Sequence, residues 1–260
     1  MEMPNFENHA ERGYAGLEKR LRRIAEELGK SGIDVDDTCH LDMWTYRSIY
    51  GDQANKDNNE VKQMEDRWAE EKGDSKKQKG RKRITNGEKM EMFKTALFHK
   101  ALGAKFYILR SSLHDDYKNG IDNVIADKES GAVVGAFDEV VAKNGRAEKE
   151  SKVAVHNTKG GAFLKYGIGI ENGQIVKQKN EHIPLFYLAL GEEELMRAIE
   201  SFDSSEENLS TLERDLLAKL AASVNEQTEA IAKIGMLKNK IPDIEKFQNA
   251  LQEATNPEKN

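Results

Sequence analysis

Three carboxylates stand inside two apolar segments in the middle of the chain. Asp122 interrupts the first segment, and the adjacent pair Asp138 and Glu139 interrupts the second. A carboxylate in an apolar strand is costly to bury unless a cation or hydrogen-bond donors meet it. The types and spacing of these residues therefore raise the question of which positive group meets them.

These segments are expected to form a β-hairpin, with strands at 120–126 and 132–142 joined by the polar turn at 127–131. A turn centred there puts Asp122 opposite residues 136–138. Strand side chains alternate between the two faces of a sheet, so the register decides which acid shares a face with Asp122.

A divalent cation would relieve the repulsion between carboxylates that face one another across paired strands. Mg²⁺ and Mn²⁺ suit oxygen ligands of this kind, and such an ion activates water against a phosphodiester. Asp122 and Asp138 are therefore candidate metal ligands, and Glu139 replaces Asp138 if the register slips by one residue. The alternative is that these acids line the solvent face of an ordinary hairpin, with Asp122 bonded to local backbone amides.

The surrounding elements indicate an α/β or mixed α+β domain at 84–191, with a central mixed sheet of about four to six strands and flanking helices. Thr85 and Glu88 form a capping box that opens the first helix. The expected elements are, in order, a helix ending at Gly103, a strand at 104–110, a loop at 111–120, the hairpin, a short helix near 148–155, a second hairpin at 166–178 and a strand at 183–190 that is covered on both faces.

Helical or charged segments are expected on both sides of this domain. The segment 1–50 is helical, 51–83 is a charged linker that is helical only near 61–68, and 192–260 is helical again. Ser204 with Glu207 suits a second capping box, and Pro242 breaks the leucine stripe Leu209–Leu237. That stripe either packs on its own domain or pairs between chains, which would give helix-mediated self-association.

The order of a capped helix, a strand, a strand with an early Asp and a strand with an acid resembles the core of the PD-(D/E)XK nucleases. The likeness covers roughly residues 85–190, with Asp122 of GIDNV and Asp138 of AFDEV matching the two acids of that family. It implies a nuclease that uses Mg²⁺ or Mn²⁺ to hydrolyse phosphodiester bonds. The chain also resembles uncharacterised bacterial proteins with D-D-x-x-N-G-x-D ahead of an A-x-D strand, and the matching residues are Asp115, Asp116, Asn119, Gly120, Asp122, Ala136 and Asp138.

One position departs from the family pattern. The family carries a lysine two residues after its second acid, where it orients the attacking water and offsets developing charge, but this chain has Val140. Lys143 and Lys165 are the candidate replacements, and Gly160 and Gly161 before Lys165 allow close backbone approach. The other outcomes are a regulatory site that binds metal weakly, or a fold that is kept without chemistry.

Glu88, Asp115 and Asp116 are candidate supporting residues. The family sometimes contributes an acid from the helix before the first strand, where Glu88 and Glu91 lie, although capping also explains Glu88. Asp115 and Asp116 follow His114, which suits a base or a ligand. The alternative is that the two acids position the loop through side-chain to backbone hydrogen bonds.

Composition limits the partners. The net charge is −6, charged residues make up 33% of the chain, and no run is long and apolar enough for a membrane span. With a single cysteine, these features favour a cytoplasmic protein without a membrane partner. A local basic run at 74–83 predicts contact with nucleic acid, or else a solvated linker. Its cations are Lys76, Lys77, Lys79, Arg81, Lys82 and Arg83.

Three functions compete on this sequence. The first is the metal-dependent nuclease, the second is a catalytically inactive nucleic-acid-binding or assembly protein on the same fold, and the third is a scaffold whose terminal helices mediate contacts. Val140 at the lysine position and the net negative charge favour the second.

Overall fold

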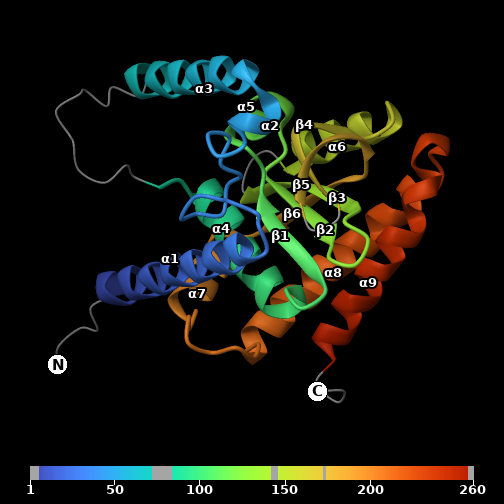
Figure 1. Ribbon diagram of the computed structural model, residues 1–260. Coiled ribbons are helices and arrows are strands. Elements are labelled where there is room, and N and C mark those ends of the chain that lie inside the picture. The colour runs from blue at the N-terminus through green and yellow to red at the C-terminus, as the bar shows by residue number, and fades with distance from the viewer. Residues whose placement is uncertain (1–5, 72–83, 142–145, 172–173, 257–260) are drawn as a thin grey trace, which may run out of the picture.

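The chain has a mixed α+β fold, which confirms the predicted fold class (Figure 1). The computed structural model describes residues 6–71, 84–141, 146–171 and 174–256. The strands are β1 (Phe106–Arg110), β2 (Asn123–Asp127), β3 (Val133–Val141), β4 (Ala162–Glu171), β5 (Gln174–Ile183) and β6 (Leu185–Leu190). The helices are α1 (Phe6–Lys30), α2 (Arg47–Tyr50), α3 (Asp52–Glu71), α4 (Asn86–Leu102), α5 (Leu113–Asn119), α6 (Arg146–Thr158), α7 (Glu192–Glu200), α8 (Thr211–Ile231), the 3₁₀ helix η1 (Gly235–Lys240) and α9 (Ile241–Thr255).

The main sheet has the strand order β1-β2-β3-β6. β1, β2 and β3 pair antiparallel, whereas β6 joins β3 in parallel after a connection that contains α6, β4 and β5. In the predicted β2–β3 hairpin, Asn123 faces Phe137, and the Asp122 amide donates to the Phe137 carbonyl at 2.9 Å. This register brings Asp122 to the level of Asp138. β4 and β5 form a separate two-stranded sheet.

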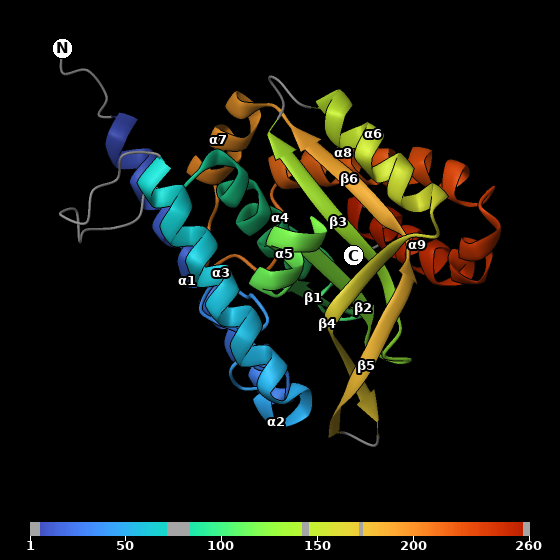
Figure 2. The same ribbon diagram turned by 90° about the horizontal axis from the view of Figure 1, so that it is seen from above.

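Different layers cover the two faces of the main sheet (Figure 2). On one face, α4, α8 and α9 pack a core rich in phenylalanine, with α1 and α7 outside α4. On the other face lie α6 and the β4–β5 sheet. β6 is buried between these layers, which explains its continuous apolar sequence. The phenylalanines of the first core are Phe93, Phe98, Phe106, Phe137, Phe186, Phe202 and Phe247.

The two ends of the chain share this core. Leu17 and Leu21 of α1 and Leu217 of α8 are fully buried in the same cluster as the residues of α4 and β3. Leu216, Leu220 and Val224 of the stripe on α8 are buried in the same cluster, so this stripe packs on its own domain, as one of the two alternatives held. Among the described residues, no helix has the length and apolar character that crossing a membrane requires.

The segment after α1 reaches the main sheet. Residues 39–41 run beside the end of β1, where the Arg110 amide donates to the Cys39 carbonyl at 2.9 Å and the Leu41 amide donates to the Arg110 carbonyl at 3.2 Å. His40 pairs with Arg110 as an isolated parallel bridge. Residues 39–41, which are distant in sequence from the β2–β3 hairpin, therefore lie beside the sheet that contains it.

The prediction of a loop at 111–120 is wrong, because this segment contains the helix α5. The Ser112 hydroxyl accepts from the Asp115 amide at 3.1 Å and caps the helix start. Gly120 ends it with a φ of 65°, a left-handed conformation that costs glycine little. The turn-forming residue types that indicated a loop are thus the caps of a short helix.

Three boundaries also differ from the sequence-based prediction. The capping box of α8 is Ser210 with Glu213, not Ser204 with Glu207. Pro242 stands in the first turn of α9, where its missing amide costs nothing, so it starts a helix and does not break one. Within the predicted linker, α3 extends from Asp52 to Glu71 and is longer than the expected helical part.

Candidate active site

Asp122, Asp138 and Glu139 converge where β2 begins and β3 approaches its end. Each of these side chains is buried. The Asp122 Oδ2 atom accepts a hydrogen bond from the Glu139 amide at 2.6 Å, which fixes it against β3. Asp138 is paired with a lysine of α6 and Glu139 with a lysine of α4, so the two neighbours contact opposite layers. The alternation expected from the sequence therefore holds.

A polar cavity of about 490 Å³ opens beside these carboxylates. It lies between the start of α4, α5, the end of β3 and α6. We call its charged wall the acidic cleft, and define it as Glu91, Asp116, Asp122, Glu139, Glu192 and Lys149.

Lys149, in the first turn of α6, supplies the amine of the acidic cleft. It pairs with Asp138, and its Nζ atom donates to the Glu139 carbonyl at 3.2 Å. Burial alone would lower the pKa of this amine, but the carboxylates of Asp122 and Asp138 raise it above its ordinary value. Lys149 is therefore an ammonium group that donates hydrogen bonds and offsets negative charge, not a neutral base.

Sequence reasoning missed Lys149, although a helix was expected to cover it. The available signal is topological. A helix that connects two parallel neighbouring strands starts beside the end of the first strand, so the first turn of α6 lies next to the acids of β3. Reading that signal requires knowing that β6 pairs with β3.

The structure places Lys165 in a different cluster, which corrects its proposed role. Its Nζ atom lies 2.5 Å from Asp57 Oδ2 on α3, and it does not line the acidic cleft. Its neighbour Tyr166 donates to the same Asp57 carboxylate at 2.6 Å. We call Asp57, His114, Lys165 and Tyr166 the anchor cluster, because they fasten α3 to α5 and β4.

Each of the other predicted site residues either belongs to one of these two clusters or has a structural role. Asp115 accepts from the backbone amides of Lys165 and Tyr166, at 2.8 and 3.1 Å, and therefore holds β4. His114 lies 3.6 Å from Asp57 in the anchor cluster. The Glu88 amide donates to the Thr85 hydroxyl at 3.2 Å, as a helix cap requires. Of the three supporting candidates, Asp116 alone lines the acidic cleft.

Lys143 and the six cations of the basic run lie outside the described residues. The candidate amine Lys143 and the predicted contacts of Lys76, Lys77, Lys79, Arg81, Lys82 and Arg83 with nucleic acid therefore remain predictions.

Two buried cations partly neutralise the acidic cleft. Lys94 of α4 is fully buried and lies 2.6 Å from Glu139 Oε1. Burial lowers the pKa of Lys94, and Glu139 opposes that shift. Arg110, at the end of β1, forms an ion pair with Glu91. Neither cation was a candidate from the sequence, because each stands in an apolar segment that indicates core packing.

Negative charge nevertheless remains in excess. Burial raises the pKa of Asp122 well above its usual range, and the nearby carboxylates Glu139, Glu91 and Asp138 add to the shift. Burial also raises the pKa of Asp138, against the opposing effect of Lys149. The pKa of Glu91 is raised by burial despite Arg110. Burial and the Glu91 charge raise the pKa of Asp116 to about 7.

A divalent cation fits this charge balance. Six carboxylates border the cleft against three cationic groups, so carboxylates are in excess and a divalent ion would offset part of that excess. Of the Glu139 carboxylate, Oε1 meets Lys94 and Asn123, whereas Oε2 is buried without a hydrogen-bond partner. The groups counted are Glu91, Asp116, Asp122, Asp138, Glu139 and Glu192 against Lys94, Arg110 and Lys149.

A second hollow, of about 530 Å³, lies between the end of α9 and the turn after β2. Its charges neutralise one another: Lys105 lies 2.7 Å from Glu253, and Lys246 lies 2.7 Å from Asp127. The acidic cleft has no such balance, and it is the better candidate for chemistry.

Comparison with known proteins adds no relative. No protein-family model, curated protein or solved structure matches the chain.

Proposed function

We propose that the protein is a divalent-metal-dependent nuclease that hydrolyses phosphodiester bonds of nucleic acid. One observation carries the proposal: acids from two paired strands meet a protonated lysine at a cavity in which negative charge is in excess. The order α4, β1, β2, β3 also agrees with the order of elements that prompted the resemblance to PD-(D/E)XK nucleases.

Asp122 would hold the ion together with Glu139, which also lines the cavity, and Asp138 completes the site by pairing with Lys149. The ion is Mg²⁺ or Mn²⁺ by the preference of these ions for carboxylate oxygen. When bound, such an ion lowers the pKa of a water molecule and stabilises charge on a phosphoryl group. Asp138 holds Lys149 in the first turn of α6, so the amine faces the cleft with its orientation fixed.

Lys149 would donate to a phosphodiester oxygen and offset the charge that develops there. Lys149 thus provides the amine that Val140 cannot, and this favours an active enzyme over an inactive nucleic-acid-binding protein on the same fold.

The test is cleavage of labelled DNA and RNA, each single- and double-stranded, with Mg²⁺, with Mn²⁺ and with a chelator. Wild-type protein is compared with Asp122→Asn and with Asp215→Asn, whose aspartate is exposed on α8. We expect cleavage by the wild type and Asp215→Asn, and a loss of about 1,000-fold in Asp122→Asn.

Equal cleavage by all three proteins would assign the activity to a contaminant and overturn the proposal. Salt-dependent binding of nucleic acid without cleavage by the wild type would establish the inactive alternative.

A further inference from the structure

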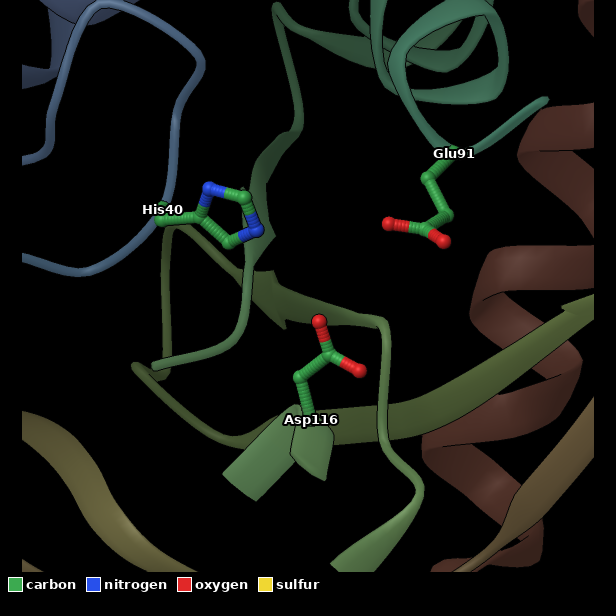
Figure 3. Close-up of side chains that lie close together, drawn as sticks. All are labelled: His40, Glu91 and Asp116. Carbon is green, nitrogen blue, oxygen red and sulfur yellow. The ribbon is translucent and has the colours of Figure 1, made fainter. Parts of the chain in front are cut away.

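Three residues from distant parts of the chain meet at one wall of the acidic cleft. His40 follows α1, Glu91 lies on α4 and Asp116 lies on α5 (Figure 3). Each offers one ligand atom, and these atoms all lie within 4.8 Å of one another. Glu91 and Asp116 also line the cavity that contains Asp122 and Glu139. This group therefore lies beside the three acids of the proposed nuclease site and shares none of them.

The orientation of His40 is that of a metal-binding histidine. Its Nδ1 atom lies 3.0 Å from the Thr38 hydroxyl and 3.5 Å from Asp36 Oδ2. Asp36 also accepts from the His40 backbone amide at 3.0 Å, so the turn and the ring are fixed together. Histidine ligands characteristically give one ring nitrogen to a carboxylate and present the other to the metal. Figure 3 shows the ring of His40 turned toward the two carboxylates.

A second observation points to a ligand at this wall. Glu139 is 4% exposed, and its Oε2 atom has no hydrogen-bond partner although it belongs to the same cleft. Its charge acts on both Glu91 and Asp116, so this buried oxygen adds to the negative potential there. Arg110 neutralises one oxygen of Glu91 but leaves this excess in place.

We infer that His40, Glu91 and Asp116 form a second divalent-cation site, next to the oxygen-only site of Asp122, Asp138 and Glu139. The inference rests on the proposed nuclease function and makes its cleft a two-cation centre. An imidazole beside two carboxylates suits Mn²⁺ or Zn²⁺ better than Mg²⁺, which prefers oxygen ligands throughout. The two sites therefore differ in the metal that they select.

Charge sets the order in which the two sites fill. The first divalent ion reduces the excess of negative charge in the cleft. A second ion then meets less negative charge until a phosphodiester enters, because each phosphodiester brings one negative charge. The second site therefore binds its ion more weakly in the free protein and more tightly with a phosphate group present.

The test is the number of Mn²⁺ ions bound, followed by electron paramagnetic resonance with and without inorganic phosphate. Four proteins are compared: the wild type, His40→Gln, Asp122→Asn and the control His156→Gln, whose histidine is exposed on α6. We expect two ions for the wild type and for His156→Gln, with the weaker one tightened by phosphate. His40→Gln is expected to keep only the tight ion, and excess Mg²⁺ to displace the tight ion more readily than the weak one.

The two proposals fail differently. Two ions in His40→Gln, with unchanged affinities, would overturn the second site and leave the nuclease proposal standing. A single ion in the wild type that is lost in Asp122→Asn would do the same. Binding of no ion by the wild type would overturn both. Asp116→Asn provides an independent variant, and circular dichroism of every protein separates loss of a ligand from loss of the fold.

Discussion

Adjacent residues of α5 belong to two polar clusters with opposite properties. Asp116 faces the acidic cleft, whereas Asp115 bonds the backbone of β4 next to the anchor cluster. Both clusters combine buried carboxylates with a lysine. Composition alone would give them the same function, and the sequence indeed suggested Lys165 of the anchor cluster as the catalytic amine.

Hydrogen bonding separates the two. In the anchor cluster Asp57 accepts from Tyr166 at 2.6 Å and from Gln53 at 2.8 Å, and it pairs with Lys165. Burial would raise the pKa of Asp57, but Lys165 and Tyr166 lower it below its usual value. Asp57, Glu60 and His114 lie close enough together to hold a metal, yet Lys165 already occupies that position as a cation.

In the acidic cleft the shifts have the opposite sign. The pKa values of Asp122, Asp138, Glu91 and Asp116 are all raised, first by burial and further by neighbouring carboxylates. In the anchor cluster, hydrogen bonds and an ion pair stabilise the charged form of Asp57. In the acidic cleft, burial and neighbouring carboxylates destabilise the charged forms of the acids. The pKa of Asp57 in the anchor cluster and the pKa values of these four cleft acids are thus shifted in opposite directions.

The sharpest test of this contrast replaces one lysine in each cluster. We expect Lys149→Ala to lower nucleic-acid cleavage by about 100- to 1,000-fold, because it removes a charged donor from the cleft. Lys165→Ala is expected to leave cleavage by the folded protein unchanged. Single-turnover rates at a temperature where both variants are folded provide the measurement, with Lys152→Ala on the exposed side of α6 as the control. A loss of cleavage confined to Lys165→Ala would reverse the assignment of the two clusters.

Metal binding should stabilise the protein through the acidic cleft alone. At Mn²⁺ concentrations of about 100 times the Kd, we expect the free energy of unfolding to rise by about 2.7 kcal/mol and Tm by about 5 to 10 °C. Thermal unfolding with and without Mn²⁺ measures this. The increase should disappear in Asp122→Asn and persist in Asp57→Asn. An increase that survives in Asp122→Asn would place the metal elsewhere.

Removal of the anchor carboxylate should cost stability and spare the chemistry. Asp57→Ala leaves Tyr166 and Lys165 without their acceptor, so we expect the free energy of unfolding to fall by about 2 kcal/mol. Urea unfolding measures the loss, and Asp52→Ala, at the exposed start of the same helix, is the control. Wild-type stability in Asp57→Ala would show that α3 is held by other contacts.

Removal of a cleft carboxylate should have the opposite effect in metal-free protein. The pKa of Asp116 is raised from 3.8 to about 7, so its charged form is disfavoured in the folded state. The contribution of Asp116 to stability is therefore largest at low pH and is lost as pH rises from about 4 through 7. At pH 8, with a chelator present, we expect Asp116→Asn to be more stable than the wild type by about 1 kcal/mol.

That gain should vanish near pH 4, where Asp116 is protonated in both states. Urea unfolding of the two proteins at pH 4 and pH 8 provides the comparison. A variant that is less stable than the wild type at pH 8 would show that Asp116 is a structural acid like Asp57.

Local sequence determined much of the domain around the hairpin. Alternation and the turn at 127–131 predict the β2–β3 pairing, and with it the approach of Asp122 to Asp138. The Thr85 cap, the apolar β6 and the helix after it are likewise visible from short-range patterns. Such features depend on neighbours within a few residues, so the sequence specifies them directly. The loop predicted at 111–120 failed for the converse reason, since capping residues resemble turn residues until the helix between them is known.

Tertiary structure alone decided which groups surround the two strand acids. The amine of Lys149 arrives through the α6 crossover, Glu91 through the packing of α4 on β3, and His40 through the chain beside β1. No sequence pattern near Asp122 predicts that these three residues lie beside it, because each of these contacts depends on how a distant element packs against the sheet. The sequence by itself placed the carboxylates, whereas packing decided that Lys149 faces them and that Lys165 pairs with Asp57.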